Sequence, residues 1–500
     1  MGIEIDGEHL TFNEFKKVCL EKERVFLSDK AREKIRNCRK ILEEIIENGG
    51  VVYGINTGFG ALSNIKISNE NLKRLQLNLI RSHAGALGDP LPEEVVRGII
   101  LLRANVLARG HSGVRDEIVD FLLSLLNNQI TPYIPSQGSV GASGDLAPLS
   151  HLALVLVGEG EVFYKGKILP SSEVLKEVGL KPLSLEPREG LALINGTQVM
   201  TSIGLNAFLL AENVVKAGDV SASMTLEALR GSLTPFDDKI HFLRPYEGQI
   251  ETARIIKKYL EGSEILKLRE KERVQDCYSL RCIPQVHGAI KDVLSFVRGV
   301  LEKEINSVTD NPIIFPNEKE VLSGGNFHGE PVAFAMDFLS IAMTELGNIS
   351  ERRIDRLVNP SLNYGLPPFL TKSPGLNSGL MMAQIVSASL ASENRTLSFP
   401  ASVENIPTTG GQEDHVSMGT ISAFKAWKIV NNTKKIISAE LLCSSQALEF
   451  LKPYEPSPFI RKVIQKIREK VPFLEEDSRI DIYLNEISRM IDFWGQIFNF

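Results

Sequence analysis

The chain has 500 residues, of which 43% are hydrophobic and 24% are charged, and its formal net charge is −6. It is long enough to bury a large core, and its slightly acidic balance favours neither nucleic acid nor an anionic membrane surface as a partner. Five dispersed cysteines and an acidic N-terminus without a signal-peptide core predict a cytoplasmic protein with reduced thiols, and the longest apolar run, residues 152–158, is too short to span a membrane.

The N-terminal part is predicted to mix short elements. Residues 49–60 are expected to contain a strand or turn that leads into a glycine-rich loop. Apolar residues at helical spacing then predict helices over residues 93–109 and 114–126. A second glycine-rich loop follows, and we expect Asp145 to cap the helix that begins after it.

Long helices are predicted to dominate the rest of the chain. Apolar periodicity, with breaks rich in proline, glycine and asparagine, places them at residues 196–231, 285–306, 331–358, 375–395, 415–450 and 457–495. The expected fold class is therefore mainly α. We expect a smaller mixed N-terminal part over residues 1–110 and a long helical bundle core over residues 111–500. Long amphipathic helices of this kind also suggest a symmetric oligomer.

The second glycine-rich loop reads GSVGASGDLAPL at residues 138–149. A turn before a helix is the ordinary role of such a loop. Asp145 excludes the G-x-S-x-G elbow of serine hydrolases, and no lysine follows Gly144 as a P-loop requires. If the amide nitrogen of Gly144 reaches the carbonyl carbon of Ala142, a five-membered ring closes. Loss of water from the ring and from Ser143 then leaves a methylidene-imidazolone, an electrophile that no unmodified side chain provides.

This loop resembles the signature of the histidine and aromatic amino acid ammonia-lyases. Further segments resemble the same family in the same order: YGINTGFG at 53–60, LALINGTQ at 191–198, VQDCYSLRCIPQ at 274–285 and SGGNFHGEP at 323–331. The resemblance implies a 4-methylidene-imidazole-5-one group formed autocatalytically from Ala142, Ser143 and Gly144. We expect neither pyridoxal phosphate nor a metal, because the sequence has no recognisable loop for the former and no H-E-x-x-H or C-x-x-C pattern for the latter. His328 and Glu330 are close in sequence, but two residues do not make a metal site.

Three residues of these segments are candidates for a part in the chemistry. In the family, the tyrosine at the position of Tyr53 is the base, although its spacing alone would better suit a buried tyrosine under a turn. Tyr278 is the other candidate for the base. The side-chain amide of Asn195 would steady negative charge on the ring, whereas the residue by itself also suits a helix N-cap before Gly196.

Residues 274–285 are expected to hold the substrate carboxylate, because a guanidinium can bind it with two parallel hydrogen bonds. The resemblance gives this role to Arg281, with Gln275 and Tyr278 as further active-site residues. It also places Phe327 beside the electrophile. Three neighbours depart from the commonest form of the family: Cys277, Ile283 and His287.

Two positions bear on the choice of substrate. A Ser-His pair, here Ser82-His83, goes with histidine in this family, and Glu413 stands where its histidine-specific members have a glutamate. A lone glutamate is usually a solvated loop residue, but a carboxylate can also orient an imidazole N–H and is costly beside a bare phenyl ring. Both positions predict deamination of L-histidine to trans-urocanate and ammonia, the first step of histidine degradation. Gly411 departs from the asparagine that such members often carry.

Other functions stay open at this point. A tyrosine or phenylalanine ammonia-lyase would keep the chemistry and change the ring. A related aminomutase can also carry the Ser-His pair and would release a β-amino acid. A scaffold without activity could reuse the fold. The resemblance further implies a homotetramer with composite active sites, an amino acid as the small-molecule partner, and neither nucleic acid nor membrane.

Overall fold

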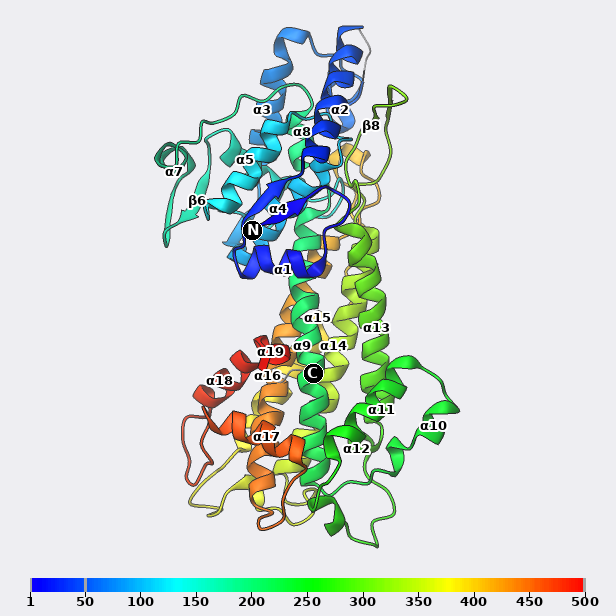
Figure 1. The fold of residues 1–500 in the computed structure, drawn as a ribbon, viewed down its shortest axis with the longest axis vertical. Coiled ribbons are helices and arrows are strands. Elements are labelled where there is room, and N and C mark those ends of the chain that lie inside the picture. The colour runs from blue at the N-terminus through cyan, green and yellow to red at the C-terminus, as the bar shows by residue number, and fades with distance from the viewer. Residues whose placement is uncertain (1, 49–51, 498–500) are drawn as a thin grey trace. The chain divides into compact units, whose positions relative to one another are not determined.

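The computed structural model describes residues 2–48 and 52–497 of the chain (Figure 1). Contacts between residues group the chain into two compact units. Unit 1 comprises Met1–Asn206, Gly299–Met336 and Pro400–Phe424, and unit 2 comprises Ala207–Arg298, Asp337–Phe399 and Lys425–Phe500. Residue 110 therefore falls inside unit 1, and the boundary expected there stays a prediction.

Unit 1 combines helices with four small sheets. Its own helices are α1 (Phe12–Leu20), α2 (Asp29–Glu47), α3 (Leu72–His83), α4 (Glu93–Ala108), α5 (Asp116–Asn127), α6 (Leu146–Leu156), α7 (Ser171–Glu177) and α8 (Glu189–Ile194). The paired strands are β1 (Ile3–Ile5) with β2 (Val25–Leu27) in parallel, and in antiparallel fashion β3 (Leu87–Pro90) with β5 (Pro135–Gln137), β4 (Thr131–Pro132) with β6 (Glu161–Tyr164), β6 with β7 (Lys167–Pro170), and β8 (Ile313–Phe315) with β9 (Glu320–Leu322). The β8–β9 hairpin lies where the sequence predicted only a break between helices.

The expected element at residues 49–60 is a turn in the part that the structure describes. Residues 49–51 lie outside the described residues, and a turn begins at Tyr53. Two short 3-10 helices follow, η1 (Gly60–Leu62) and η2 (Asn69–Asn71). The loop that carries Tyr53 thus has no strand among its described residues.

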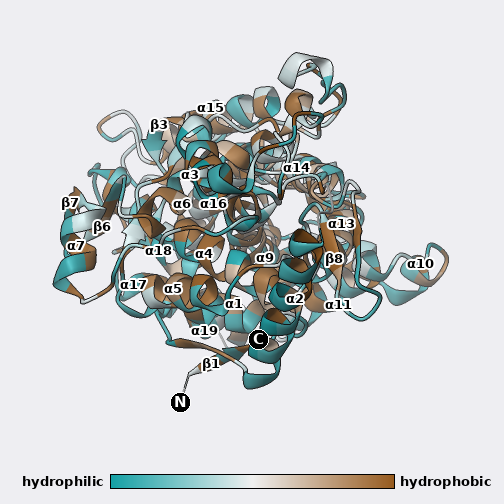
Figure 2. Ribbon diagram, turned by 90° about the horizontal axis from the view of Figure 1, so that it is seen from above, coloured by the Kyte–Doolittle hydropathy of each residue, from teal (hydrophilic) through white to brown (hydrophobic). Residues whose placement is uncertain are grey.

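Helix α4 forms the centre of unit 1. Every residue from Val95 to Ala108 is buried, including the arginines Arg97 and Arg103. A helix that is buried on all sides needs neighbours that approach closely, and a Cβ atom added to Gly98 would lie only 2.2 Å from the Ser202 hydroxyl oxygen. The helix predicted at residues 93–109 is therefore confirmed. Helix α2, by contrast, carries polar and apolar residues on different faces and buries only one of them (Figure 2).

Asp145 occupies the N-cap position of α6, but its side chain makes no capping hydrogen bond there. Its Oδ2 atom instead accepts the N–H groups of Val199 (3.0 Å) and Met200 (2.9 Å). Both groups belong to the first turn of α9 (Gln198–Ala228), where backbone N–H groups have no partner within the helix. Asp145 therefore caps a different helix from the one that the sequence predicted.

Four long helices contribute residues to both units: α9, α13 (Ile283–Glu304), α14 (Glu330–Val358) and α16 (Gly419–Glu449). The other helices of unit 2 are α10 (Asp238–Phe242), α11 (Glu247–Leu260), α12 (Tyr278–Arg281), α15 (Met381–Leu397), α17 (Pro458–Arg468), α18 (Ile480–Asp492) and α19 (Trp494–Ile497). Gly218 of α9 lies against Leu346 of α14 and Ile437 of α16, so these three helices pack together in unit 2. The expected mainly α fold with a long helical core is confirmed.

The single helix predicted at residues 457–495 is wrong. The segment contains α17, α18 and α19, with no helix between Arg468 and Ile480. Pro472 lies in this gap, and proline lacks the N–H group that a helix interior needs. The remaining short 3-10 helices are η3 (Thr234–Phe236), η4 (Ile265–Leu268), η5 (Pro368–Leu370) and η6 (Thr409–Gly411).

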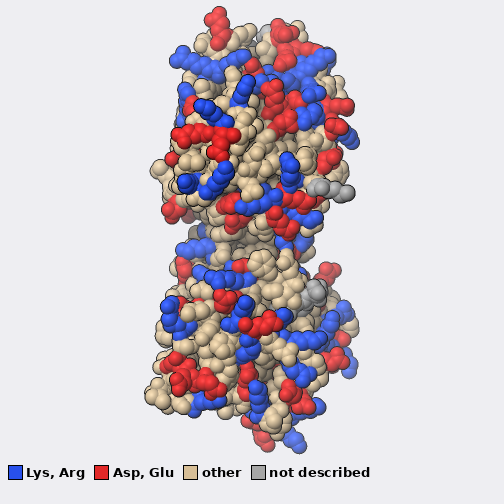
Figure 3. Space-filling view, turned by 60° about the vertical axis from the view of Figure 1, so that its left-hand side comes forward, with Lys and Arg blue, Asp and Glu red and all other residues tan. Residues whose placement is uncertain are grey.

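One described helix, α14, is long and apolar enough to cross a membrane, but 72% of its apolar window is buried inside the protein. A buried core helix of a folded protein passes the same test of length and composition. On the face drawn in Figure 3, acidic and basic side chains of the described residues are intermixed.

Candidate active site

A cavity of about 520 Å³ in unit 1 brings together five of the residues that the sequence singles out. Tyr53, His83, Ser143, Asn195 and Glu413 all line it. They come from the loop after α2, the end of α3, the glycine-rich loop before α6, the end of α8 and the loop before α16. Residues more than 300 positions apart in the chain therefore face one small space.

The glycine-rich loop is held in a tight conformation. Gly141 and Gly144 both have positive φ angles, of 67° and 70°, which glycine adopts without steric cost. The Asp145 N–H donates to the carbonyl oxygen of Gly196 at 2.8 Å, and a Cβ atom on Gly144 would lie 2.1 Å from that oxygen. Only glycine can therefore stand at position 144. Ala142 is buried, and Ser143, which lies between Ala142 and Gly144, faces the cavity.

Glu413 is bound on both of its carboxylate oxygens. Its Oε1 accepts the Ser143 hydroxyl at 2.9 Å. Its Oε2 accepts the hydroxyls of Thr408 and Thr409 at 2.7 and 2.6 Å. Thr408 and Glu413 also form an antiparallel bridge that closes the loop between them. Glu413 is therefore a positioned, half-buried carboxylate and not a freely solvated one.

Thr408 and Thr409 are partners of Glu413 that the sequence reading did not identify. Two hydroxyl residues four and five positions before a candidate carboxylate, in a glycine-rich loop, are the signal that points to them. Gly410 and Gly411 give this loop its turn, with φ angles of 65° and 86°. Asparagine also tolerates positive φ, and a Cβ atom at Gly411 would meet nothing within 4 Å.

Tyr53 lies at the cavity with its hydroxyl oxygen accepting the N–H of Gly60 at 3.3 Å. A Cβ atom on Gly60 would lie 2.7 Å from the Thr409 methyl group, so the Tyr53 loop packs directly on the Glu413 loop. Tyr53 is only half-buried. It is thus accessible from the cavity, unlike a tyrosine buried under a turn.

His83 ends helix α3 and presents one nitrogen to the protein. Its Nδ1 atom lies 2.9 Å from the carbonyl oxygen of Leu79 and 3.0 Å from the Ser82 hydroxyl. Because a carbonyl only accepts, we assign the proton of the neutral ring to Nδ1. The Nε2 atom is then an acceptor, which suits an N–H group of a ligand.

Asn195 follows α8 as its C-cap residue, so the alternative that it is the N-cap of a helix is wrong. Its carbonyl oxygen accepts a hydrogen bond from Arg103 at 2.6 Å. Its side-chain Oδ1 is buried and has no hydrogen-bond partner among the described residues. An unsatisfied buried polar atom beside a cavity is typical of a site that receives a ligand.

Gln275, Tyr278 and Arg281 lie together in unit 2. The guanidinium carbon of Arg281 is 4.7 Å from the centre of the Tyr278 ring, and Arg281 donates to the Gln275 side chain. Gln275 and Arg281 line a cavity of about 380 Å³, and Tyr278 is 70% exposed. Phe327 lies in unit 1, in the turn before α14, and is half-buried; it is not among the described residues that line the 520 Å³ cavity.

Known proteins resemble this chain over almost its whole length. A family model for aromatic amino acid lyases matches residues 10–469. The chain belongs to the aromatic amino acid lyase family. Histidine ammonia-lyase of Natranaerobius thermophilus is 51% identical over 489 residues, which are 98% of this chain and 96% of that protein. Histidine ammonia-lyase of Caldanaerobacter subterraneus is 53% identical over 481 residues, 96% of this chain and 94% of that protein.

Solved structures of lyases and aminomutases also resemble this aromatic amino acid lyase. Histidine ammonia-lyase from Trypanosoma cruzi is 42% identical with a TM-score of 0.93, over 100% of this chain and 94% of the other. Tyrosine aminomutase from Streptomyces globisporus is 38% identical with a TM-score of 0.94, over 100% and 98% of the two chains. Structural similarity alone therefore does not separate deamination from amino-group transfer.

One histidine-containing group in this lyase has the spacing of metal ligands. His328, Glu330 and His415 place their ligand atoms within 4.8 Å of one another, and the two imidazole rings are parallel with centroids 5.7 Å apart. However, Nδ1 of His328 lies 3.4 Å from the backbone N–H of Glu330, as an acceptor. This contact occupies the Nδ1 lone pair of His328. Asp6, Glu8 and His9 form a second group of this kind.

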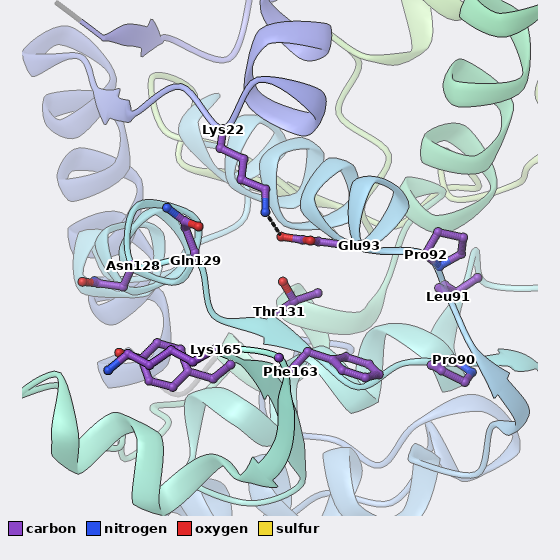
Figure 4. Close-up of a pocket in the computed structure, with 12 residues that line it drawn as sticks. Lys22, Pro90, Leu91, Pro92, Glu93, Asn128, Gln129, Thr131, Phe163 and Lys165 are labelled. Carbon is purple, nitrogen blue, oxygen red and sulfur yellow. Dashed lines mark ion pairs between the residues drawn. The ribbon is translucent and has the colours of Figure 1, made fainter. Parts of the chain in front are cut away.

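A larger cavity of about 700 Å³ in unit 1 is separate from these residues (Figure 4). It contains an ion pair between Lys22 and Glu93 at 2.8 Å, and none of the described residues predicted to act on substrate lines it. Its charged pair is already satisfied and partly solvated. The 520 Å³ cavity is therefore the candidate active site of this aromatic amino acid lyase.

Proposed function

We propose that this aromatic amino acid lyase removes ammonia from L-histidine and releases trans-urocanate, as a carbon–nitrogen lyase. The observation that carries the proposal is the shared cavity of Ser143, His83 and Glu413, in which an electrophile position, an imidazole acceptor and a carboxylate meet. Relatives that are 51% and 53% identical over nearly the full length are named histidine ammonia-lyase. This supports histidine over tyrosine or phenylalanine.

The residues fit a 4-methylidene-imidazole-5-one group formed from Ala142, Ser143 and Gly144. Gly144 has no room for a side chain, and Asn195 lines the same cavity, where its side-chain nitrogen can donate a hydrogen bond to the ring. When formed, the group supplies an electrophile for the substrate amine. The other components of the reaction are side chains of the chain itself, so no metal or pyridoxal phosphate is part of the proposal.

The remaining residues bind the substrate and move its proton. The substrate ring is bound as an imidazolium, in which the Nε2 atom of His83 accepts one ring N–H and Glu413 accepts the other. Arg281, with Gln275, binds the substrate carboxylate through parallel hydrogen bonds. The phenol oxygen of Tyr53 removes the β-proton, and Tyr278 is the alternative for this step. Phe327 packs against the bound substrate.

We also propose that the enzyme is a homotetramer with composite active sites, as its resemblance to the family implies. Two helices carry exposed apolar faces that support an assembly. On α14 these residues are Phe334, Phe338 and Ile341, and on α15 they are Met382 and Ile385, all between 46% and 50% exposed. Contiguous apolar patches of this kind mark protein–protein contacts. A cytoplasmic location, as expected from the cysteines, completes the proposal.

A spectrophotometric assay with L-histidine, L-tyrosine and L-phenylalanine tests the function. The conjugated acid and the released ammonia are measured together. Urocanate and ammonia from histidine alone are the expected result. Cinnamate or coumarate would overturn the choice of substrate. A β-amino acid without ammonia would favour the aminomutase, to which this chain is also structurally similar.

A further inference from the structure

Arg103 is a buried cation directly behind the candidate active site. It lies in α4 and is fully buried. Its Nη1 donates to the carbonyl oxygen of Asn195 at 2.6 Å and to the side-chain oxygen of Gln198 at 2.9 Å. Its Nε and Nη2 have no hydrogen-bond partner among the described residues. Burial lowers the pKa of Arg103 to about 10, which still leaves it charged at neutral pH.

A buried, incompletely paired guanidinium is unfavourable for stability by itself. Large hydrophobic side chains fill comparable positions of α4 at no such cost, as Leu101 and Leu107 do. We therefore expect the Arg103 guanidinium to have a role other than packing.

The bonded carbonyl belongs to a peptide that contacts the glycine-rich loop. Gly196 is so enclosed that a Cβ atom would lie 2.8 Å from Nη1 of Arg103 and 2.9 Å from the carbonyl oxygen of Thr309. On its other side, the carbonyl oxygen of Gly196 accepts the N–H of Asp145, and Gly196 pairs with Gly144 in a parallel bridge. The backbone at Asn195 and Gly196 thus contacts Arg103 on one side and the glycine-rich loop that carries Ser143 on the other.

Gln198 extends this contact into a network. Its side-chain oxygen accepts from Arg103, and its side-chain nitrogen donates to the Thr309 hydroxyl at 2.7 Å. The carbonyl oxygen of the Asn195–Gly196 peptide is thus bound by Arg103, and the buried side chain of Gln198 and the backbone of Thr309 enclose Gly196. A displacement of the backbone at Asn195 and Gly196 would move both the Asn195 side chain and the Gly196 carbonyl oxygen that accepts the Asp145 N–H.

We propose that Arg103 is a positioning residue of the active site, which fixes the Asn195–Gly196 backbone and through it both the Asn195 amide and the Gly144 peptide. This inference rests on the proposed function, because it concerns formation of the same group. It assigns no contact with substrate to Arg103.

The affected covalent step is ring closure and dehydration. The Gly144 nitrogen bonds to the Ala142 carbonyl carbon, and the Ala142 oxygen leaves as water with the protons of the Gly144 and Ser143 amides. A second water forms from the Ser143 hydroxyl and the Ser143 α-proton. No oxidant or reductant is needed. The step requires the Gly144 nitrogen to be held against the Ala142 carbonyl, which is why the register with Gly196 matters.

Arg97 provides a matched control in the same helix. It is also an almost fully buried arginine whose pKa is lowered by burial. It donates to the carbonyl oxygens of Val18 and Leu126 at the ends of α1 and α5, at 2.9–3.2 Å. Neither carbonyl belongs to a segment that lines the candidate active site. Loss of Arg97 therefore reports the cost of a buried arginine without the effect on the site.

The experiment compares the full-length wild type with Arg103→Met, Arg103→Lys and Arg97→Met. Intact mass shows how many waters each protein has lost, and hydrogen exchange measures protection of the Asp145 amide. We expect Arg103→Met to retain unreacted chain and to exchange faster at Asp145. In its matured fraction we expect kcat to fall about 10- to 100-fold with little change in KM, as for a displaced catalytic geometry. Arg103→Lys should be intermediate, and Arg97→Met should mature fully.

Each outcome decides. If Arg103→Met matures, exchanges and turns over like the wild type, the positioning role is wrong. It is equally wrong if Arg97→Met shows the same deficits at equal thermal stability. Should Arg103→Met not accumulate as folded protein, Arg103→Lys against Arg97→Met gives the same comparison. A wild type that loses no water and does not act on histidine would overturn the proposed function itself.

Discussion

The polar interior of unit 2 and the polar surroundings of the candidate active site are built differently. In unit 2, Glu440 accepts Arg353 on both oxygens at 2.6 and 2.9 Å, and also three hydroxyls. Arg353 further donates to His287, whose Nδ1 faces Asp219 at 2.8 Å. Beside the cavity of unit 1, by contrast, Asn195 and Arg103 keep unpaired polar atoms among the described residues.

This difference separates stability from function. Fully paired buried networks contribute rigidity, and unsatisfied groups persist where a ligand or a reaction uses them. The pKa directions agree. Burial acts to raise the pKa of Glu440, but Arg353 together with the hydroxyls of Ser350 and Thr225 holds that pKa below its usual value. Asp145 beside the active site has no such cation, and burial raises its pKa despite hydrogen bonds from Thr420 and Met200. Changes near the cavity should therefore alter chemistry, and changes in the bundle should alter stability.

Replacement of Ser143 by alanine should have the largest effect on chemistry. The Ser143→Ala variant has no hydroxyl to lose as water, so we expect activity on histidine to disappear while the melting temperature stays near that of the wild type. Turnover and thermal unfolding are measured on the same preparation. Ser150→Ala is the control, because its hydroxyl bonds only to the Leu146 carbonyl within α6. Undiminished turnover in Ser143→Ala would contradict the proposed electrophile.

Removal of Arg353 should have the largest effect on stability. Arg353→Met leaves Glu440 as an uncompensated buried charge, which costs about 3–5 kcal/mol when one partner of a buried pair is removed. We expect a matching loss in denaturant unfolding and an unchanged kcat for the fraction that remains folded. In the double variant with Glu440→Leu, part of the stability should return, because no unpaired charge remains. An Arg353→Met variant with unchanged stability and a reduced kcat would contradict the view that this network serves stability and not catalysis.

Glu413→Gln should reduce turnover of histidine by about 100-fold, as expected when the substrate is held in the wrong orientation. The amide keeps the shape of the carboxylate but has no charge with which to orient an imidazolium or imidazole N–H. Binding of a carboxylate analogue without an imidazole ring should change little. Thr409→Val is the control, because it removes one of the hydroxyls on Oε2 and leaves the charge. Equal losses for histidine and the analogue would argue against a ring-binding role.

Local sequence patterns predicted the helices well and the contacts between segments poorly. Periodicity predicted both ends of α13 and α14 to within two residues, because the apolar residues of a buried helix face recur at each turn along the sequence. The same local patterns wrongly predicted one continuous helix across Pro472. They also predicted that Asp145 caps the helix directly after it. The true partners of Asp145, Val199 and Met200, lie more than 50 residues away. No local pattern encodes such a contact.

The candidate site shows the same division. Motif resemblance selected Tyr53, His83, Ser143, Asn195 and Glu413, and these residues share one cavity. Their individual roles stay predictions. The residues that hold them were not found, because Arg103 reads as part of an apolar helix and Thr408 and Thr409 read as a glycine-rich loop. Positioning depends on which distant carbonyl or carboxylate a side chain meets, and this is set by the fold.

Glu227 is a buried carboxylate of unit 2 that differs from Glu440, and its replacement should give the smallest effect. It accepts the Ser457 N–H at 2.7 Å and a hydrogen bond from Ser263, and no cation pairs with it among the described residues. Burial raises its pKa to about 7. Because the folded state holds this proton more tightly than the unfolded chain, the stabilisation is complete below pH 4.5 and is lost as the pH rises to about 7.

Glu227→Gln mimics the protonated form, so the variant should match the wild type near pH 5 and exceed it near pH 8. Between these values the free energy of unfolding of the wild type should fall relative to the variant by about 1.4 kcal/mol per pH unit at most. Denaturant unfolding at several pH values measures this, and Glu261→Gln on the exposed surface after α11 is the control. A wild type that gained stability over the variant with rising pH would show that Glu227 is ionised and paired in the folded protein, as Glu440 is.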